Sequence, residues 1–211
     1  MAGGVRIEVE DDPTPMVLIL AATLRRAVRT EKLADTLRSA RGSVALKSTT
    51  DPQAATIRFA DGTARVERGA ATDADVTIAT DVNALSDEHP PKPKVSGAAR
   101  HPKLALAASK LLEPPQDSWQ IEAGRFWAFC AGHPGVPSGI RVVCRDDRSE
   151  ITLGSAPPEY ELQGRAHALA SLFCGNTVLG QEVLDGKLYA VGALSHTAEL
   201  TGRSIAWMLG G

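Results

Sequence analysis

The side chains that could act as a nucleophile or a base are scattered along the chain. His133 lies in a loop rich in Gly and Pro, Ser195 and His196 are adjacent, and His167 stands among apolar residues. No nucleophile elbow, zinc-protease motif or Gly-rich phosphate loop accompanies them. The spacing from His167 to Cys174 does not match a zinc site. We therefore predict no catalytic residue, no metal ligand and no cofactor, and we expect a protein that is not an enzyme.

Cysteine usage and charge limit the class of protein further. The three cysteines, Cys130, Cys144 and Cys174, are odd in number and form no CxxC motif, which fits buried thiols in a reducing compartment. The net charge is −2 and no basic run occurs, so we expect no nucleic-acid partner. The apolar run that starts at Met16 is much shorter than the roughly 20 residues of a membrane span. Acidic residues precede it, unlike in a signal peptide. We predict a cytoplasmic protein without stable membrane insertion.

The stretch 56–68, TIRFADGTARVER, predicts a β-hairpin around Asp61-Gly62. Apolar and polar residues alternate on both sides of the turn, and the Gly supplies the positive φ that a tight turn requires. The stretch 140–153, IRVVCRDDRSEITL, has the same form with a longer turn. Repetition of a supersecondary unit predicts a duplicated module.

Alternation and helical spacing predict the same order of elements after each hairpin. For the first module we expect strands at 43–47, 76–80 and 94–97 and helices at 14–29, 31–40 and 102–112; residues 1–12 are an extra edge strand or a frayed terminus. The stretch 73–94 includes a proline-rich loop. For the second we expect strands at 125–130, 140–145, 150–153, 160–162 and 188–191 and helices at 165–174, 176–184 and 195–209.

The predicted fold class is therefore α+β, with two repeated modules. Each module is a mainly antiparallel five-stranded sheet covered by helices. The first module spans 1–112, a linker follows at 113–124, and the second, shorter module spans 125–211.

The chain resembles the sterol carrier protein type 2 family, in what looks like two tandem copies of which the second is divergent. The resemblance is carried by ADGTARV at 60–66, DADVTIAT at 73–80, PKVSG at 93–97, HPKLALAASKLL at 101–112 and, in the second copy, DGKLYAVGA at 185–193. It implies an apolar tunnel or cleft between a five-stranded sheet and its helices, which binds sterols, fatty acyl chains or similar ligands. The same fold also serves as an accessory domain of larger enzymes.

Aromatic residues separate the two modules. Of the nine, eight lie at Trp119 or beyond, whereas small residues surround the last helix of the first module. Either the second module holds the ligand against its aromatic residues, which we favour, or those residues fill it and the first module holds the open site. The candidate ligand-binding residues are Trp127, Phe129, Val142, Phe173, Tyr189, Ile205 and Trp207, with Leu104 and Ala108 in the first module.

These observations favour a non-catalytic binding or carrier protein for an apolar small molecule such as a lipid, an acyl chain or a sterol-like compound. The alternative is a structural or interaction protein with a filled core, which associates with a partner enzyme. A weaker third hypothesis is a small lipid-modifying enzyme, with His133 and Ser195 as the residues to test.

Overall fold

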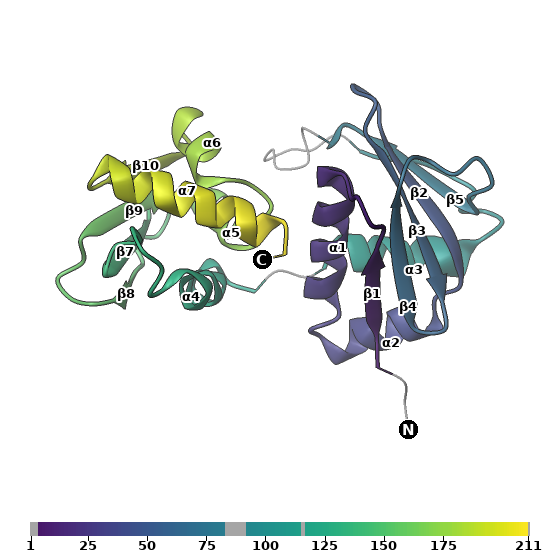
Figure 1. The fold of residues 1–211 in the computed structure, drawn as a ribbon, viewed down its shortest axis with the longest axis horizontal. Helices are drawn as coiled ribbons and strands as arrows, with labels where there is room; N and C mark the ends of the chain where they lie inside the picture. Colours follow the sequence, from purple (N-terminus) through teal and green to yellow (C-terminus); the bar gives the residue numbers. More distant parts are fainter. Residues whose placement is uncertain (1–3, 83–91, 115–116, 211) are drawn as a thin grey trace. The chain divides into compact units, whose positions relative to one another are not determined.

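The computed structural model describes residues 4–82, 92–114 and 117–210, and the chain forms two compact units that divide near residue 115 (Figure 1). Within these residues there are seven helices and two sheets, of six and four strands, so the fold is mixed α+β as predicted. Residues 83–91 of the predicted proline-rich loop lie outside the described residues.

The first unit is a six-stranded sheet in the order β1-β4-β3-β2-β5-β6. Five of its strands, β2 to β6, were expected, and the N-terminal segment, which could have been an edge strand or a frayed terminus, adds a sixth because it pairs in parallel with β4. The bounds are β1 (Arg6–Val9), β2 (Gly42–Ser48), β3 (Ala54–Ala60), β4 (Thr63–Arg68), β5 (Val76–Thr80) and β6 (Lys94–Ser96).

One face of this sheet is apolar because the strand registers align its inward residues. Ile57 lies opposite Val66 on one side and Val44 on the other, and Val44 lies opposite Val76. All four side chains are buried in one cluster. The predicted hairpin is confirmed as β3 and β4, with Asp61 and Gly62 both at positive φ in the turn.

Three helices pack on that apolar face: α1 (Pro15–Ala27), α2 (Glu31–Ser39) and α3 (Pro102–Leu112). The α1 helix begins after Thr14, whose hydroxyl accepts a hydrogen bond from the Val17 amide at 3.5 Å, as an N-cap residue does. Leu24 and Leu37 are fully buried between the helices and the sheet.

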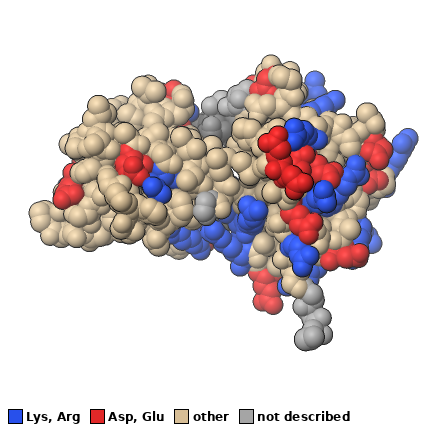
Figure 2. All heavy atoms as spheres, in the orientation of Figure 1, with Lys and Arg blue, Asp and Glu red and all other residues tan. Residues whose placement is uncertain are grey.

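Charged residues cover the opposite face of the first sheet. Glu67 lies 3.3 Å from Arg58 and 2.8 Å from Arg65 in pairs across and along the strands. Figure 2 shows red and blue side chains interspersed over this unit, whereas the visible face of the second unit carries few charges. Exposed pairs of this kind contribute little stability, so this face is a solvated surface.

The second unit is a four-stranded sheet in the order β10-β9-β7-β8, with helices on one face. Ile140 lies opposite Leu153 and Tyr160, and Val142 lies opposite Ile151 and Leu162, so these inward residues form its apolar face. The bounds are α4 (Trp119–Cys130), β7 (Gly139–Cys144), β8 (Glu150–Gly154), β9 (Tyr160–Gly164), α5 (Ala166–Phe173), α6 (Leu179–Leu184), β10 (Leu188–Val191) and α7 (Leu194–Met208).

The strand predicted at 125–130 is wrong, because these residues form the last half of α4. The aromatic run RFWAFC has the composition of a strand. However, Trp119, Ala123, Phe126 and Cys130 follow the i, i+4, i+7, i+11 spacing of a helix face, and all four are buried. Burial of that complete face outweighs the local strand preference of the run.

The two sheets share a pairing pattern. In the second, β7 pairs antiparallel with β8 and parallel with β9, and β9 pairs antiparallel with β10. In the first, β2 pairs in the same way with β3 and β5, and β5 with β6. The hairpin at 140–153 therefore corresponds to β2 and β3, and not to the Asp-Gly hairpin of β3 and β4. The origin of both units in one repeated module stays a prediction.

Candidate functional site

The aromatic residues of the second unit gather between three of its helices. Phe126 of α4 lies 5.7 Å from the ring of Phe173 in α5 and 6.3 Å from that of Trp207 in α7, measured between centroids. Phe129, one turn further along α4, lies 5.3 Å from Trp207. These tilted and edge-on arrangements are the ones that aromatic pairs prefer. We call Phe126, Phe129, Phe173 and Trp207 the aromatic cluster.

A hydrogen bond fixes the orientation of the cluster's tryptophan. The Trp207 indole N–H donates to the carbonyl oxygen of Phe173 at 2.7 Å. This bond satisfies a carbonyl at the end of α5 and holds the two helices together. Trp207 is nevertheless only partly buried, as is Phe129, whereas Phe126 and Phe173 are buried. The cluster therefore has a closed inner part and a partly open outer part.

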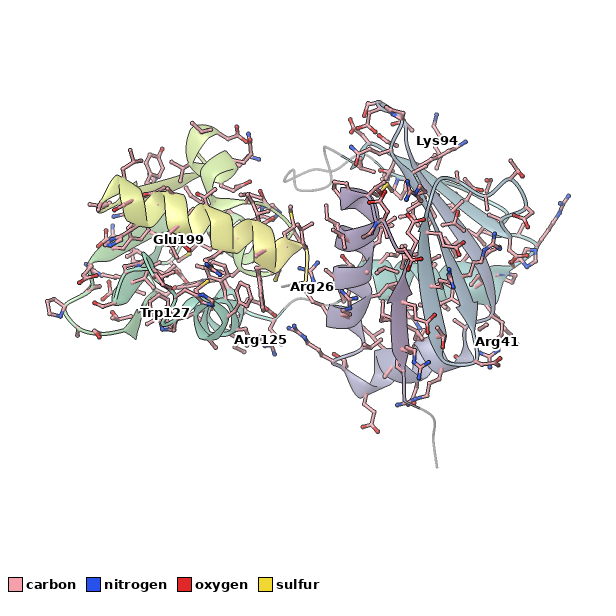
Figure 3. All side chains as sticks on the ribbon, viewed as in Figure 1. Arg26, Arg41, Lys94, Arg125, Trp127 and Glu199 are labelled. Atoms are coloured by element: carbon pink, nitrogen blue, oxygen red, sulfur yellow. The ribbon has the colours of Figure 1, made fainter. Side chains whose placement is uncertain are left out.

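Trp127 leaves α4 in another direction and covers the end of β8. A Cβ placed on Gly154 would lie 2.5 Å from the Trp127 ring, so the ring contacts this strand where a side chain is absent. Figure 3 shows Trp127 beside α4, in the part of the unit that holds the strands β7 and β8. Gly154 also has a φ of +81°, which favours glycine. Trp127 therefore packs against the sheet and not in the aromatic cluster.

A polar group lies next to the outer part of the cluster. Glu199 and Arg203 of α7 form an ion pair at 2.9 Å. Burial is the main cause that raises the pKa of the Cys130 thiol on α4; the charge of Arg203 lowers this pKa and that of Glu199 raises it. The ring of His133 lies 6.5 Å from that of Phe129. Arg203 lies four residues before Trp207 and therefore on the same side of α7. Apolar rings with a neighbouring cation and anion are the elements of a site for a ligand with an apolar body and a polar end.

Buried polar groups anchor the helices that carry the cluster. The Tyr160 hydroxyl lies 3.0 Å from that of Thr197, and burial raises the pKa of Tyr160. The Ser204 hydroxyl accepts a hydrogen bond from the Leu179 amide at 3.0 Å. Both bonds attach α7, one to β9 and one to α6. Since unsatisfied buried polar groups cost about 1–3 kcal/mol, these bonds hold α7 in one position.

The structure brings together some of the predicted site residues and separates others. Phe173, Trp207 and Phe129 meet in the aromatic cluster, and Val142 lies in the same core below it. Tyr189 lies on the opposite face of the sheet, half exposed, with Arg145 stacked 4.8 Å from its ring centroid. The remaining candidates lie elsewhere: Trp127 over β8, Ile205 on the exposed side of α7, and Leu104 and Ala108 in the core of the first unit.

Sequence reasoning missed Phe126, which contacts both Phe173 and Trp207. The strand predicted at 125–130 assigned it to the face opposite Trp127 and Phe129. The buried helical stripe at positions 119, 123, 126 and 130 is the signal that would have identified it.

Ser43, Asp75 and His101 lie close together in the first unit, but the carboxylate lies between the hydroxyl and the imidazole, and this arrangement does not activate the serine. The Asp75 carboxylate accepts hydrogen bonds from the Ser43 amide at 2.8 Å and from its hydroxyl at 3.0 Å. His101 lies 3.6 Å from the other carboxylate oxygen. In an activated serine the imidazole accepts the hydroxyl proton, whereas here the carboxylate lies between the two. These bonds hold the pKa of Asp75 below its ordinary value and join β2 to β5.

The thiols do not provide a nucleophile either. Cys130, Cys144 and Cys174 are buried. Burial raises the pKa of Cys130 to about 12, so this thiol stays protonated at neutral pH. Within the described residues no group of three His, Cys, Asp or Glu side chains could hold a metal ion. None of the helices described has both the length and the apolar character needed to cross a membrane.

No protein-family model matches the chain, and no curated protein matches it. Among solved structures, it is similar to a crystal structure of sterol carrier protein 2, with 20% identity and a TM-score of 0.34 over 44% of this chain and 90% of that one. It is also similar to the solution structure of a conserved hypothetical protein, possibly a sterol carrier protein, from Thermus thermophilus. That pair has 9% identity and a TM-score of 0.21, over 98% of this chain and 93% of that one. Both TM-scores are low, so a functional proposal depends on the geometry of the chain itself.

Proposed function

We propose that the chain is a non-catalytic binding or carrier protein for an apolar small molecule, such as a lipid, an acyl chain or a sterol-like compound, and that the second unit binds it. The observation that carries the proposal is the half-open aromatic cluster. Phe129 and Trp207 contact each other in a tilted arrangement next to buried Phe126 and Phe173, yet remain partly accessible. Their accessible rings are apolar surface that a ligand could cover.

The free energy available from such binding is set by the apolar area removed from water. Burial contributes about 25 cal/mol per Å² before ordering costs are subtracted. Aromatic rings supply large contact areas and lose little side-chain freedom. The Arg203 guanidinium beside the cluster adds a donor for a polar end of the ligand. The first unit offers no comparable cluster, because Phe59 is its single aromatic residue.

The tryptophans provide a direct assay. Trp119, Trp127 and Trp207 all belong to the second unit, so energy transfer from tryptophan to a polyene fatty acid (cis-parinaric acid) or to dehydroergosterol reports binding there. The Phe129→Ala variant should weaken binding of the probe about tenfold, which corresponds to about 1.4 kcal/mol of lost contact. The control is Leu184→Ala, since Leu184 is 85% exposed on α6 and outside the cluster.

Mass spectrometry of solvent extracts from the purified protein completes the test. A co-purified lipid, displaced by the probe, would support the proposal. Extracts without lipid, together with no binding of either probe, would exclude it. Unchanged affinity of the Phe129→Ala variant would place the ligand away from the cluster.

The alternative is a structural or interaction protein, and the closed inner part of the same unit favours it. Tyr160, Phe173 and Leu169 are almost fully buried there, so side chains of this protein fill the space nearest the sheet. A protein of this kind would show no increase in melting temperature with saturating probe, whereas a ligand in excess of its Kd stabilises the native state by RT ln(1 + [L]/Kd).

A further inference from the structure

Strand β8 forms one border of the second sheet, and part of its backbone faces outward from that border (Figure 1). The Cys144 amide donates to the Ser149 carbonyl oxygen, and the Ser155 amide donates to the Ser138 carbonyl oxygen, each at 2.8 Å. Hydrogen-bonded and non-hydrogen-bonded pairs alternate between antiparallel strands, so the odd-numbered residues of β8 bond to β7. We call the outward-facing amide and carbonyl groups the open edge of β8. They belong to Glu150, Thr152 and Gly154.

The first unit shows what covers the equivalent edge there. Since β2 and β7 have matching partners in the two sheets, β8 corresponds to β3. However, β3 is not a border strand, because β4 pairs antiparallel with its other side. The Ser48 amide donates to the Gln53 carbonyl oxygen at 2.8 Å, and the Gly69 amide donates to that of Ala54 at 2.9 Å. Odd-numbered residues of β3 therefore bond to β2 and even-numbered ones to β4. In the first unit an antiparallel strand thus satisfies the groups that correspond to the open edge.

Core side chains next to the open edge are less covered than their counterparts in the first unit. Ala55 and Ile57 of β3 face the core and are 0% exposed. At the same positions of β8 stand Ile151 and Leu153, which are only partly buried. Trp127, which packs against the end of β8, is partly buried as well. A further strand at the open edge would cover apolar surface here, as β4 does in the first unit.

The other borders of the two sheets differ from β8. Strand β10 corresponds to β6, which is a border in the first sheet too, so the comparison gives no reason for a further strand there. Charged side chains, which protect borders against pairing, stand on β1 and β6: Arg6, Glu8 and Lys94. The charged residue of β8 is Glu150, and its carboxylate forms an ion pair with Arg141 of neighbouring β7. The open edge therefore has little protection against pairing.

We propose that a second copy of this chain pairs with β8 through its own open edge, antiparallel about a two-fold axis at Thr152. The hydrogen-bonding groups agree with this axis, because Thr152 meets the partner's Thr152 and Glu150 meets the partner's Gly154. All of these residues direct their amide and carbonyl groups outward, so each opposed pair is a hydrogen-bonded one. The two four-stranded sheets then join into one continuous sheet.

The side chains of β8 favour a second copy over an unrelated strand. On the core face the axis sets Ile151 of each copy opposite the partner's Leu153, so apolar side chains meet on both sides of the axis. On the outer face it brings two threonines together, which is a favourable cross-strand pair. Glu150 comes opposite a glycine, keeps its ion pair with Arg141 and meets no like charge. The strand is therefore complementary to itself in backbone, apolar contact and charge.

The length of β8 sets the expected strength of this dimer. The strand has 5 residues. One pair of strands of this length buries less than the roughly 1,200 Å² of a standard stable interface. We therefore expect a dissociation constant in the range of about 10–100 μM, where dimer formation depends on concentration.

Sedimentation velocity of the full chain, from about 1 μM to about 1 mM, tests the proposal. The wild-type protein should shift from monomer to dimer over this range. Thr152→Pro removes the central amide of the open edge and keeps every bond from β8 to β7, so circular dichroism should show a folded protein. Its dimer should be at least about tenfold weaker, because both copies lose a hydrogen bond at the axis. A wild-type monomer at every concentration, or a dimer that Thr152→Pro does not weaken, would overturn the inference.

Charge variants at Thr152 test the position of the axis. Thr152→Lys sets two cations opposite each other and Thr152→Glu two anions, so each variant alone should dimerise about fivefold more weakly than the wild type. Mixed in equal amounts, the two should form a heterodimer at least as tight as the wild-type dimer. Val191→Lys, which adds a charge at a 60% exposed residue of the opposite border β10, is the matched control and should leave the dimer unchanged. A mixture no tighter than its components, or a dimer that Val191→Lys weakens instead, would refute pairing through β8.

Discussion

A matched pair of core truncations tests whether the two units have independent cores. Phe173 lies in the core of the second unit and Phe59 in that of the first, and their exposed fractions are only 1% and 3%. Replacing a buried Phe by Ala removes its contacts and leaves a cavity, at a cost of about 3–5 kcal/mol. Domains of this size are stable by about 5–15 kcal/mol, so either unit would lose a large part of its stability.

The assay follows urea unfolding through tryptophan fluorescence, which reports on the second unit, and circular dichroism, which reports on both. With a urea dependence of about 1.5 kcal/mol per M, a loss of about 3 kcal/mol lowers the midpoint by about 2 M. Phe173→Ala should shift the fluorescence midpoint by this amount. Phe59→Ala should shift only the part of the dichroism transition that belongs to the first unit. Equal shifts of the fluorescence midpoint in both variants would refute the division into separate cores.

Three further predictions concern the anchors described above. Asp75 has a lowered pKa because Ser43 donates two hydrogen bonds to its carboxylate, so it stabilises the fold above its unfolded pKa near 4 and loses this contribution as pH falls through the lower folded value. The melting temperature of Asp75→Asn should consequently fall less between about pH 4 and pH 2 than that of the wild type, and parallel curves would disprove this role. The Cys130 thiol should resist alkylation by iodoacetamide at about pH 8 until the protein unfolds, and rapid labelling of the native protein, mapped by mass spectrometry, would contradict its burial. Gly154→Ala would place a methyl group against the Ser138 carbonyl oxygen and the Trp127 ring at a positive φ, so its free energy of unfolding should fall by about 1–3 kcal/mol in the urea assay; a neutral effect would contradict the close packing at this end of β8.

The sequence predicted the elements whose pattern is local. The Asp61-Gly62 hairpin and the helix expected at 14–29 were both predicted correctly. Each depends on a turn residue, a cap or an alternation that is visible within about ten residues. The pairing of the N-terminal strand with β4 was left open, because its partner lies far along the chain.

The candidate site was predicted less well, because residues 125–130 were assigned the two-residue period of a strand and not the 3.6-residue period of a helix. This error changed the side on which each aromatic residue of the segment was expected. Assigning 125–130 to a strand gave Trp127 and Phe129 the same side and Phe126 the other. The helix instead directs Phe126 and Phe129 to α5 and α7 and Trp127 to β8. A period of about 3.6 residues and one of about 2 give different partners to the same side chains. Tyr189 is separated from the cluster for a simpler reason, since it alternates with the inward residues of β10.

The strand registers also bear on the order in which the chain acquires its structure. In the first unit Arg6 pairs with Thr63, so one edge of the sheet joins residues separated by half of that unit. In the second unit, Ile140 pairs with Tyr160 and Gly164 with Leu188, and each strand finds its partner within a short stretch. Because closing long loops slows folding, the C-terminal half is expected to refold faster than the N-terminal half. During synthesis the N-terminal half, which folds more slowly, leaves the ribosome first. Its strand β1 can pair only after β4 has been synthesised, so the six-stranded sheet forms late in the synthesis of this half.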